Sequence, residues 1–236
     1  MPFAGFDVAR FPGPTIMKAL WDNSNLRWVG FYLPVSGPGY GDKLTWSKTF
    51  ESLRAIGWGV APIYLGKQPN SSKLALKHGE EHLDGYMDGI EAAGFASQEG
   101  MPAGTVIYFD QEIPSSDAAW LAHYFGWVKA VIDQGYKPGI YCSYTIAKTI
   151  GAYVTQRSSD ATPEVWVWNV DKYPAHQSYS DLNKIPTPDP AGAGGAGSSW
   201  QYIQGSRLSV KGKVISPVDF DSSTFTDPGQ RTIAPT

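Results

Sequence analysis

The sequence has a single cysteine, few charged residues and no long apolar run. Cys142 is the only cysteine among 236 residues, so an internal disulfide framework is excluded. Charged residues make up 17% of the chain, the formal net charge is −3, and Lys and Arg form no cluster. This charge argues against nucleic acid or an anionic membrane surface as the main partner. No stretch reaches about 18 apolar residues, so no membrane span is expected.

The N-terminus leaves no room for a signal peptide within this chain, because a strand-like segment begins within about five residues. A processed or trimmed secreted protein would look the same. We therefore expect an extracellular or cell-envelope protein only on the strength of the resemblance described below.

Aromatic residues are abundant, with 9 Trp and 13 Tyr in a chain that is 42% hydrophobic. Rings at this density can fill a core, and they can also line a sugar-binding cleft. The composition alone leaves both uses open.

Strand-like and helix-like segments alternate along the chain. Strands are expected at 5–8, 28–35, 58–66, 105–110, 137–143, 164–170, 199–203 and 218–220. Helices are expected at 14–22, from Trp46 to Ile56, at 72–94, from Ser116 to Gly135 and at 145–154. The inner face of the third helix is expected to consist of Leu76, Leu83, Met87 and Ile90.

Eight short strands with helices between them indicate a parallel sheet closed into a single (β/α)₈ TIM-type barrel. The last βα units are irregular, because a loop rich in Pro, Gly and Ser replaces a helix at 171–198. We expect the barrel to span 1–225 and a polar C-terminal tail to follow at 226–236. An open doubly wound sheet is the alternative, but the first strand is followed by "ARFPG", which has no dinucleotide fingerprint.

Carboxylates mark the ends of three expected strands. Asp7 ends the first strand, Asp110 and Glu112 end the fourth, and Asp219 lies in the eighth. Because residues two apart in a strand point to the same side, about 6–7 Å apart, Asp110 and Glu112 should face one cleft. The eighth strand closes the barrel against the first, so Asp7 and Asp219 should be neighbours. No Lys, Arg or His accompanies these acids at a strand end.

Such a set of acids suits glycoside hydrolysis. One carboxyl group must stay protonated to donate to the leaving oxygen, and another must stay ionised to stabilise positive charge on the sugar. Crowding of like charges raises one pKa, so Asp110 is expected to hold Glu112 protonated. The expected rim residues are Tyr32, Tyr64, Tyr141, Trp166, Trp168 and Gln201. A single Asp at a strand end is more often a helix cap or turn residue, and Asp221 is interpreted as a turn residue.

The motifs "GFDVA", "YFDQE", "PGIYCS", "WQY" and "VDFD" resemble the ordered motifs of the family 25 lysozymes. A second resemblance, to a glycoside-hydrolase-like family of bacterial domains of unknown function (number 1906), covers nearly the whole chain. It is carried by "FDVARFPG", "LWDNSNLRWVGFYL", "GWGVAPIYLGKQ", "AGTVIYFDQE", "GYKPGIYCSY" and "PTPDP".

The lysozyme resemblance implies a barrel that cleaves peptidoglycan glycan strands. Position by position, it makes Glu112 the general acid and Asp110 its neighbouring carboxylate. Asp7 and Asp219 match the other two acidic positions, and Gln201 and Tyr141 match residues of the cleft. It favours a retaining outcome, with Asp110 or an N-acetyl group of the substrate as the stabilising partner.

Two other functions remain open beside hydrolysis. The barrel can bind cell-wall glycan without cutting it, or it can be a metal-dependent hydrolase such as a deacetylase. The second is disfavoured because no His lies at a strand end. No cofactor or metal is expected, and we expect a monomer that takes a polysaccharide such as peptidoglycan as its substrate.

Three other signals are interpreted as structural. "HGEEH" at 78–82 places two His residues four apart, but Gly79 departs from the zinc-protease pattern, so a solvated helix face is the simpler interpretation. "AGAGGAGSS" at 191–199 has no Lys and predicts a flexible loop. Cys142 lies inside a strand and is interpreted as a buried structural thiol.

Overall fold

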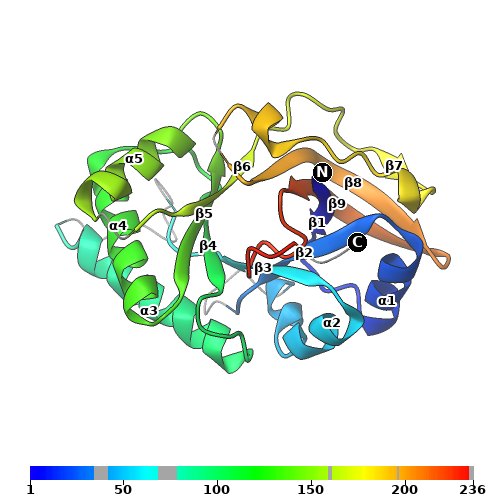
Figure 1. The fold of residues 1–236 in the computed structure, drawn as a ribbon, viewed down its shortest axis with the longest axis horizontal. Coiled ribbons are helices and arrows are strands. Elements are labelled where there is room, and N and C mark those ends of the chain that lie inside the picture. Colours follow the sequence, from blue (N-terminus) through cyan, green and yellow to red (C-terminus); the bar gives the residue numbers. More distant parts are fainter. Residues whose placement is uncertain (35–41, 69–78, 159–160, 196, 234–236) are drawn as a thin grey trace.

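The computed structural model describes residues 1–34, 42–68, 79–158, 161–195 and 197–233. Its strands form one sheet that curls round until its ends meet (Figure 1). The strands are β1 (Phe3–Asp7), β2 (Leu26–Tyr32), β3 (Gly59–Tyr64), β4 (Val106–Asp110), β5 (Lys137–Ser143), β6 (Glu164–Trp168), β7 (Ser178–Tyr179), β8 (Ser199–Val210) and β9 (Lys213–Ser223). Their order is β6-β5-β4-β3-β2-β1-β9-β8-β7, and pairing between β6 and β8 closes an eight-stranded barrel with β7 outside it.

Helices cover the outside of this barrel (Figure 1). They are α1 (Pro14–Asn23), α2 (Phe50–Ile56), α3 (Glu81–Gln98), α4 (Ala118–Asp133) and α5 (Ala147–Arg157), with short 3₁₀ turns at Lys43–Trp46, Leu182–Lys184 and Pro190–Ala193. The local signals act as expected at α4, where the Asp117 side chain accepts a hydrogen bond from Trp120 N at 2.8 Å. The single (β/α)₈-type barrel expected from the alternation of strands and helices is confirmed.

The expectation that all barrel strands are parallel was wrong for β9, which runs antiparallel to both β1 and β8. The reason is the short connection before it. Lys211 and Gly212, with φ of 48° and 73°, turn the chain directly from β8 into β9. Positive φ at two successive residues is the geometry of a tight hairpin, which joins antiparallel strands. Both strands are longer than the segments expected at 199–203 and 218–220.

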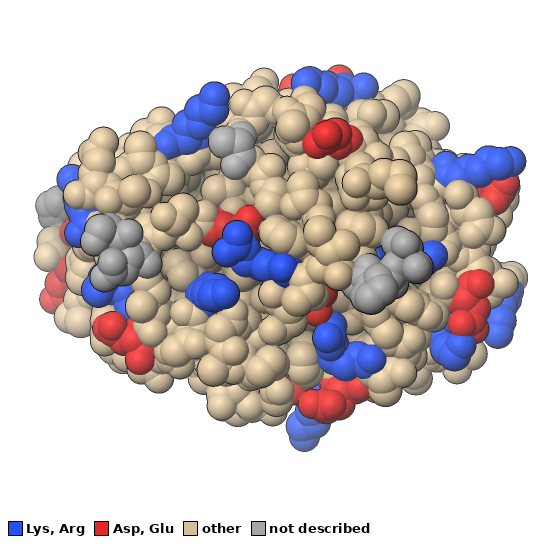
Figure 2. All heavy atoms as spheres, in the orientation of Figure 1, with Lys and Arg blue, Asp and Glu red and all other residues tan. Residues whose placement is uncertain are grey.

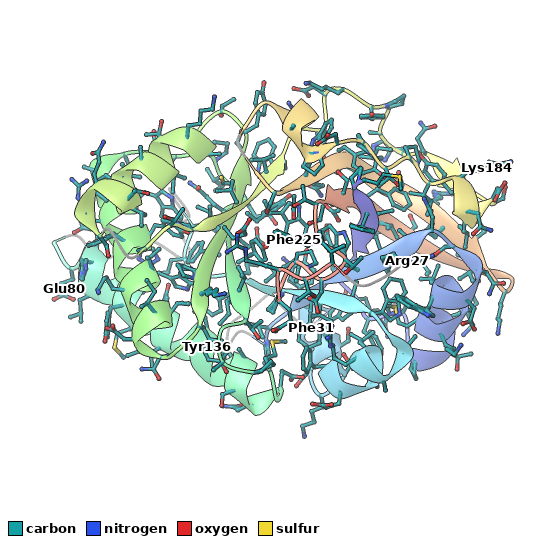
Figure 3. The ribbon with its side chains drawn as sticks, viewed as in Figure 1. Arg27, Phe31, Glu80, Tyr136, Lys184 and Phe225 are labelled. Carbon is teal, nitrogen blue, oxygen red and sulfur yellow. The ribbon has the colours of Figure 1, made fainter. Side chains whose placement is uncertain are left out.

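Aromatic rings fill the interior of the barrel. Trp166 packs edge-on against Trp28, Tyr108 and Tyr141, with ring centroids 5.2, 5.6 and 5.2 Å apart. Gly30 lies against this cluster, because a Cβ atom there would lie 3.3 Å from Cη2 of Trp166 and 2.7 Å from Cβ of Asp7. Much of the aromatic content is therefore buried in the core; the side chains are drawn in Figure 3.

The inner face expected for the third helix was wrong. Leu83 and Met87 are 57% and 55% exposed, and Ile90 is exposed as well, whereas Leu76 lies outside the described residues. Small residues and one acid face inward instead: Asp84, Gly85, Gly89, Ala92, Ala93 and Ala96. The helix packs so closely on α4 that large side chains do not fit between the two backbones.

We expect Gly126→Ala in α4 to destabilise the protein by about 3 kcal/mol, because overpacking forces backbones apart. A Cβ atom at this position would lie 2.0 Å from the backbone oxygen of His82 in α3. Thermal unfolding followed by circular dichroism should show a melting temperature lower by roughly 10 °C. Gly94→Ala in α3 is the matched control, since a Cβ atom there meets nothing within 4 Å. An equal loss in both variants would contradict the close-packing explanation.

The C-terminal segment crosses the end of the barrel at which the parallel strands begin (Figure 1). Val106 N donates to Gly229 O at 2.7 Å, and Gly229 N donates to Val60 O at 3.1 Å. The buried Asp227 pairs with Arg54, and Phe225 lies over the middle of the barrel in Figure 3. Residues 227–229 of the expected tail therefore help to cover this end of the barrel.

The face seen in Figure 2 carries Lys and Arg side chains mixed with Asp and Glu side chains, without a large area of one sign. Among the helices described, none is long and apolar enough to cross a membrane.

Candidate active site

Carboxyl groups from three strands meet around one cavity at the carboxyl ends of the parallel strands. Asp7 is the last residue of β1, Asp110 is the last residue of β4, and Asp219 pairs directly with Asp7 across β1 and β9. Eight of the predicted site residues line this cavity: Asp7, Tyr32, Asp110, Glu112, Tyr141, Trp166, Gln201 and Asp219. Its volume of about 120 Å³ provides a small pocket at the mouth of the barrel.

Asp7 is buried and carries a hydrogen bond from the Tyr32 hydroxyl, with 2.8 Å between OH and Oδ1. Burial, and after it the charge of Asp219, raises the pKa of Asp7 to about 8. The Tyr32 hydrogen bond and the Lys43 ammonium oppose this rise in pKa. At neutral pH the proton on Asp7 is therefore held mainly by the cost of burying its charge.

Asp110 is only 2% exposed. Burial raises its pKa well above the usual value, and the charge of Glu112 raises it further, whereas Lys43 lowers it. Nζ of Lys43 lies 3.8 Å from Oδ2 of Asp110 and 4.3 Å from the centre of the Tyr32 ring. The site therefore contains a cation that the strand-end argument did not find, because Lys43 comes from a 3₁₀ turn between β2 and α2.

Asp219 lies within the antiparallel strand β9 rather than at the end of a parallel strand. Its Oδ2 accepts from Gln201 Nε2 at 2.8 Å, and its Oδ1 accepts from Gly205 N at 2.7 Å. Burial raises its pKa, and the Gly205 hydrogen bond is the largest opposing effect. The Tyr141 hydroxyl donates to Oε1 of Gln201, so this phenol, the amide and the carboxylate form one chain of hydrogen bonds.

Asp221 was interpreted as a turn residue, and this was wrong. It is fully buried in β9, where its Oδ1 accepts from Trp166 Nε1 at 3.1 Å. Burial raises the pKa of Asp221 well above its usual value, and the charges of Asp7 and Asp219 raise it in the same direction. A hydrogen bond to Asp7 also favours its protonated form. The alternation "DFD" was the available signal, since residues two apart in a strand share a face.

Glu112 follows β4 and its side chain is exposed at the cavity. Its backbone N donates to Oε1 of Gln68 at 2.9 Å. Gln68 and the lining residues Ile63 and Gln204 were not identified from the sequence. Gln68 and Gln204 lie outside the expected strands or beyond their ends, where alternation gives no signal.

The structure does not bring Tyr64 or Trp168 to the cavity. Tyr64 is buried with its hydroxyl 2.6 Å from Oε2 of Glu91 in α3, so it faces the helix layer. Trp168 Nε1 lies 3.5 Å from Gln111 O, beside the segment that carries Glu112. Trp166 does line the cavity, but it is fully buried and forms its floor rather than a surface on which a sugar can stack.

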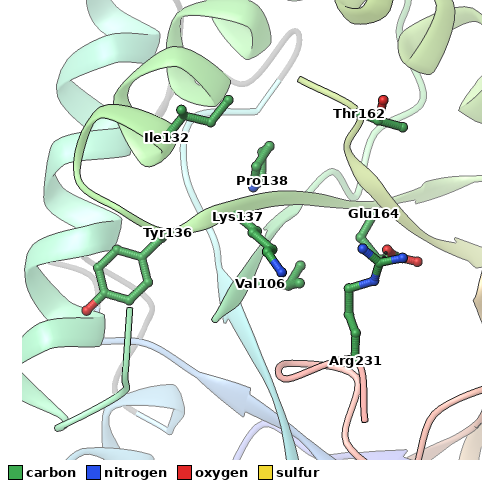
Figure 4. A pocket seen from close by; sticks show the side chains of 8 residues that line it. All are labelled: Val106, Ile132, Tyr136, Lys137, Pro138, Thr162, Glu164 and Arg231. Atoms are coloured by element: carbon green, nitrogen blue, oxygen red, sulfur yellow. Dashed lines mark ion pairs between the residues drawn. The ribbon is translucent and has the colours of Figure 1, made fainter. Parts of the chain in front are cut away.

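A larger hollow of about 310 Å³ lies at the opposite end of the barrel (Figure 4). Its rim carries Lys137, Thr162, Glu164 and Arg231. Nε of Arg231 pairs with Oε2 of Glu164 at 2.9 Å, so the acid there is already neutralised. The chemistry therefore points to the smaller cavity, at the end of the barrel where enzymes of this architecture place their catalytic groups.

Within the described residues, no group of three or more His, Cys, Asp and Glu side chains is arranged to hold a metal ion. His78 of the "HGEEH" segment lies outside those residues, and the His82 ring packs against Phe125 with centroids 5.8 Å apart. Cys142 is a free, buried cysteine, as interpreted from the sequence, and burial raises the pKa of its thiol.

Comparison with known families and structures gives a consistent result. The sequence profile of the Rv2525c-like, glycoside hydrolase-like domain matches residues 18–221. An uncharacterized B. stearothermophilus protein superposes with a TM-score of 0.61 at 18% identity, over 94% of this chain and 95% of that chain. The Mycobacterium tuberculosis Tat-secreted protein Rv2525c gives a TM-score of 0.60 at 13% identity, over 98% and 99% of the two chains.

The modular autolysin LytC of Streptococcus pneumoniae is also similar, with a TM-score of 0.56 at 16% identity. The match covers 94% of this chain but 46% of LytC, which has also been solved with a synthetic peptidoglycan ligand. No curated protein sequence matches the chain. At these identities the structural likeness shows the shared barrel fold.

Proposed function

Because the chain belongs to the Rv2525c-like, glycoside hydrolase-like family, we propose that it hydrolyses a glycan of the bacterial cell wall. The observation that carries this proposal is the meeting of Asp7, Asp110, Glu112 and Asp219 around one cavity. Peptidoglycan is the proposed substrate, because the modular autolysin LytC, part of which shares this fold, has been solved in complex with a synthetic peptidoglycan ligand. An extracellular or cell-envelope location fits a family that includes a Tat-secreted protein.

Glu112 is the proposed general acid. Its exposed carboxyl group can reach the glycosidic oxygen of a glycan lying over the cavity, whereas Asp7 and Asp110 are buried and Asp219 is half-buried. Proton donation to the leaving oxygen is the step that such an acid accelerates. The proton then passes from Glu112 to that oxygen as the glycosidic bond breaks, and a water molecule finally adds to the sugar carbon and gives a proton back to Glu112.

Asp110 is the proposed carboxylate that stabilises the positive charge on the sugar. It must be ionised to do so, and Lys43 lowers its pKa against the effect of burial. Asp219 lies beside Asp7, which holds a proton at neutral pH, and Tyr32, Tyr141 and Gln201 hold the oxygens of these two acids in place. The family resemblance favours retention, through Asp110 or through the N-acetyl group of the substrate.

Glycan binding without cleavage is the second candidate, and the buried acids favour it. The pKa of Asp7 is raised to about 8, so this acid holds a proton at neutral pH, and burial raises the pKa of Asp110 in the same direction, away from the negative charge that hydrolysis needs. A site in this protonation state can still hydrogen-bond sugar hydroxyl groups. We propose that a single copy of the chain is sufficient for either function.

The test is incubation of the purified protein with peptidoglycan over a range of pH, followed by measurement of new reducing ends and fragment masses. New reducing ends at muramic acid would support a muramidase. No product at any pH, with the protein sedimenting together with the glycan, would favour the binding function. If the protein neither releases product nor binds the glycan, peptidoglycan is excluded as its ligand.

A further inference from the structure

The position of Glu112 is not set by the barrel ladder. β4 ends at Asp110, and the last pair of residues in register between β3 and β4 is Tyr64 with Phe109. Glu112 lies beyond this ladder with its side chain exposed. A proton donor needs a defined position, so another group must hold this segment.

Beyond the end of this ladder, the side chain of Gln68 binds the backbone of the segment that carries Glu112. Its Nε2 donates to Asp110 O at 2.6 Å, and its Oε1 accepts from Glu112 N at 2.9 Å. One amide group thus binds the backbone on both sides of Gln111, much as a further residue of β3 would. Gln68 is 6% exposed, so water competes little for these two hydrogen bonds.

The other edge of the same segment is held by β5 and β6. Gln111 N donates to Tyr141 O at 2.8 Å, and Trp168 Nε1 lies 3.5 Å from Gln111 O. These contacts fix Gln111, the residue between the two acids. The backbone of Glu112 is fixed from the Gln68 side.

Gln68 is in turn tied to the helix layer through its neighbour Lys67. Nζ of Lys67 lies 3.2 Å from Oδ1 of Asp84 and 3.6 Å from Oδ1 of Asp88, both in α3. Asp84 is buried, and Oδ2 of Asp88 lies 3.4 Å from Nε2 of the buried His123 in α4. These contacts explain why an acid, rather than an apolar residue, occupies the inner face of α3 at position 84.

We propose that Gln68 is the positioning residue for Glu112 and that the Lys67 contacts with α3 hold Gln68 in place. The catalytic consequence rests on the function proposed above for Glu112, but the structural role does not. A misplaced acid slows proton transfer without changing how the glycan binds. Loss of Gln68 should therefore lower kcat and leave KM nearly unchanged.

Gln68→Met tests this role, because Met has a similar length and shape but cannot make the two hydrogen bonds. Hydrogen exchange followed by NMR should show the Glu112 amide exchanging at least about tenfold faster. On peptidoglycan, kcat should fall by about 10- to 100-fold with KM within about twofold of wild type. Lys67→Met should change both quantities in the same direction but less, and Lys67→Arg should restore them, because Arg keeps the positive charge.

Asn25→Leu is the control for a general loss of stability. It removes a part-buried amide whose Nδ2 donates to Ile185 O at 2.8 Å, away from the site. It should leave the exchange rate at Glu112 and the value of kcat unchanged.

Unchanged exchange at Glu112 in Gln68→Met would overturn the proposal whatever the activity shows. Faster exchange with an unchanged kcat would overturn the positioning role. If the wild type releases no fragments, the proposed hydrolysis fails, and the exchange rates alone decide whether Gln68 holds Glu112. Faster exchange together with a lower kcat and an unchanged KM is the expected result.

Discussion

Glu112→Gln should release no measurable fragments from peptidoglycan while still sedimenting with the glycan. The amide has nearly the shape of the carboxyl group but no acidic proton to donate. Loss of a general acid typically costs about 10²- to 10⁴-fold in rate, which places the product below ordinary detection. Binding should persist, because the exposed Glu112 side chain is only one of the groups that line the cavity.

The measurement compares reducing ends and fragment masses from wild type and variant under identical conditions. Glu51→Gln is the matched control, because Glu51 is exposed in the first turn of α2 and does not line the cavity. It should cleave like wild type. A Glu112→Gln protein that retains more than about a tenth of the wild-type rate would show that another group donates the proton.

Asp7→Asn should stabilise the protein at pH 8 and have little effect at pH 4. The pKa of Asp7 is raised from 3.8 to about 8 by burial and by the charge of Asp219. At a pH between 3.8 and about 8, the unfolded chain has released the Asp7 proton and the folded chain still holds it. The contribution of Asp7 to the free energy of unfolding is therefore fully present below its unfolded pKa and is lost as the pH rises toward its folded pKa.

The size of this effect is set by the difference in proton binding. One such group removes about 1.4 kcal/mol of unfolding free energy for each pH unit across this window. Asn cannot ionise, so the variant avoids this loss and can still accept the Tyr32 hydrogen bond. The difference in melting temperature between variant and wild type should grow by about 3–6 °C for each pH unit.

Differential scanning fluorimetry of both proteins from pH 4 to pH 9 measures this difference directly. Asp171→Asn is the control, because it removes one negative charge from an exposed position. Its difference from wild type should stay nearly constant with pH. A constant difference for Asp7→Asn as well would mean that Asp7 is ionised throughout this range in the folded protein.

The barrel was predictable from the sequence because its strands are apolar, short and regularly separated by helical patterns. The direction of β9 was not, because it depends on the turn at Lys211 and Gly212 and on a strand that begins in the exposed residues Lys213 and Val214. The inner face of α3 was missed for a related reason. Helical periodicity predicts that large apolar residues face inward, but the close approach of two backbones leaves room only for small ones.

For the site, the position of acids at strand ends was sufficient to bring Asp7 and Asp110 to one cavity, and barrel closure added Asp219. Lys43 could not be predicted in this way, because it enters the site from a turn rather than from a strand. Tyr64 was placed wrongly because the face of a strand cannot be fixed without its register. In the structure that register directs its hydroxyl to Glu91.

The pairing of β1 with β9 joins residues 3–7 to residues 219–223. During synthesis, at about 5–20 residues per second, the first strand therefore waits at least about ten seconds before its partner exists. Asp7 cannot meet Asp219 on the nascent chain until then, so the acidic cavity is among the last features to form. Contacts of such long sequence separation also fold slowly. The acidic cavity therefore cannot form until Asp219 has left the ribosome.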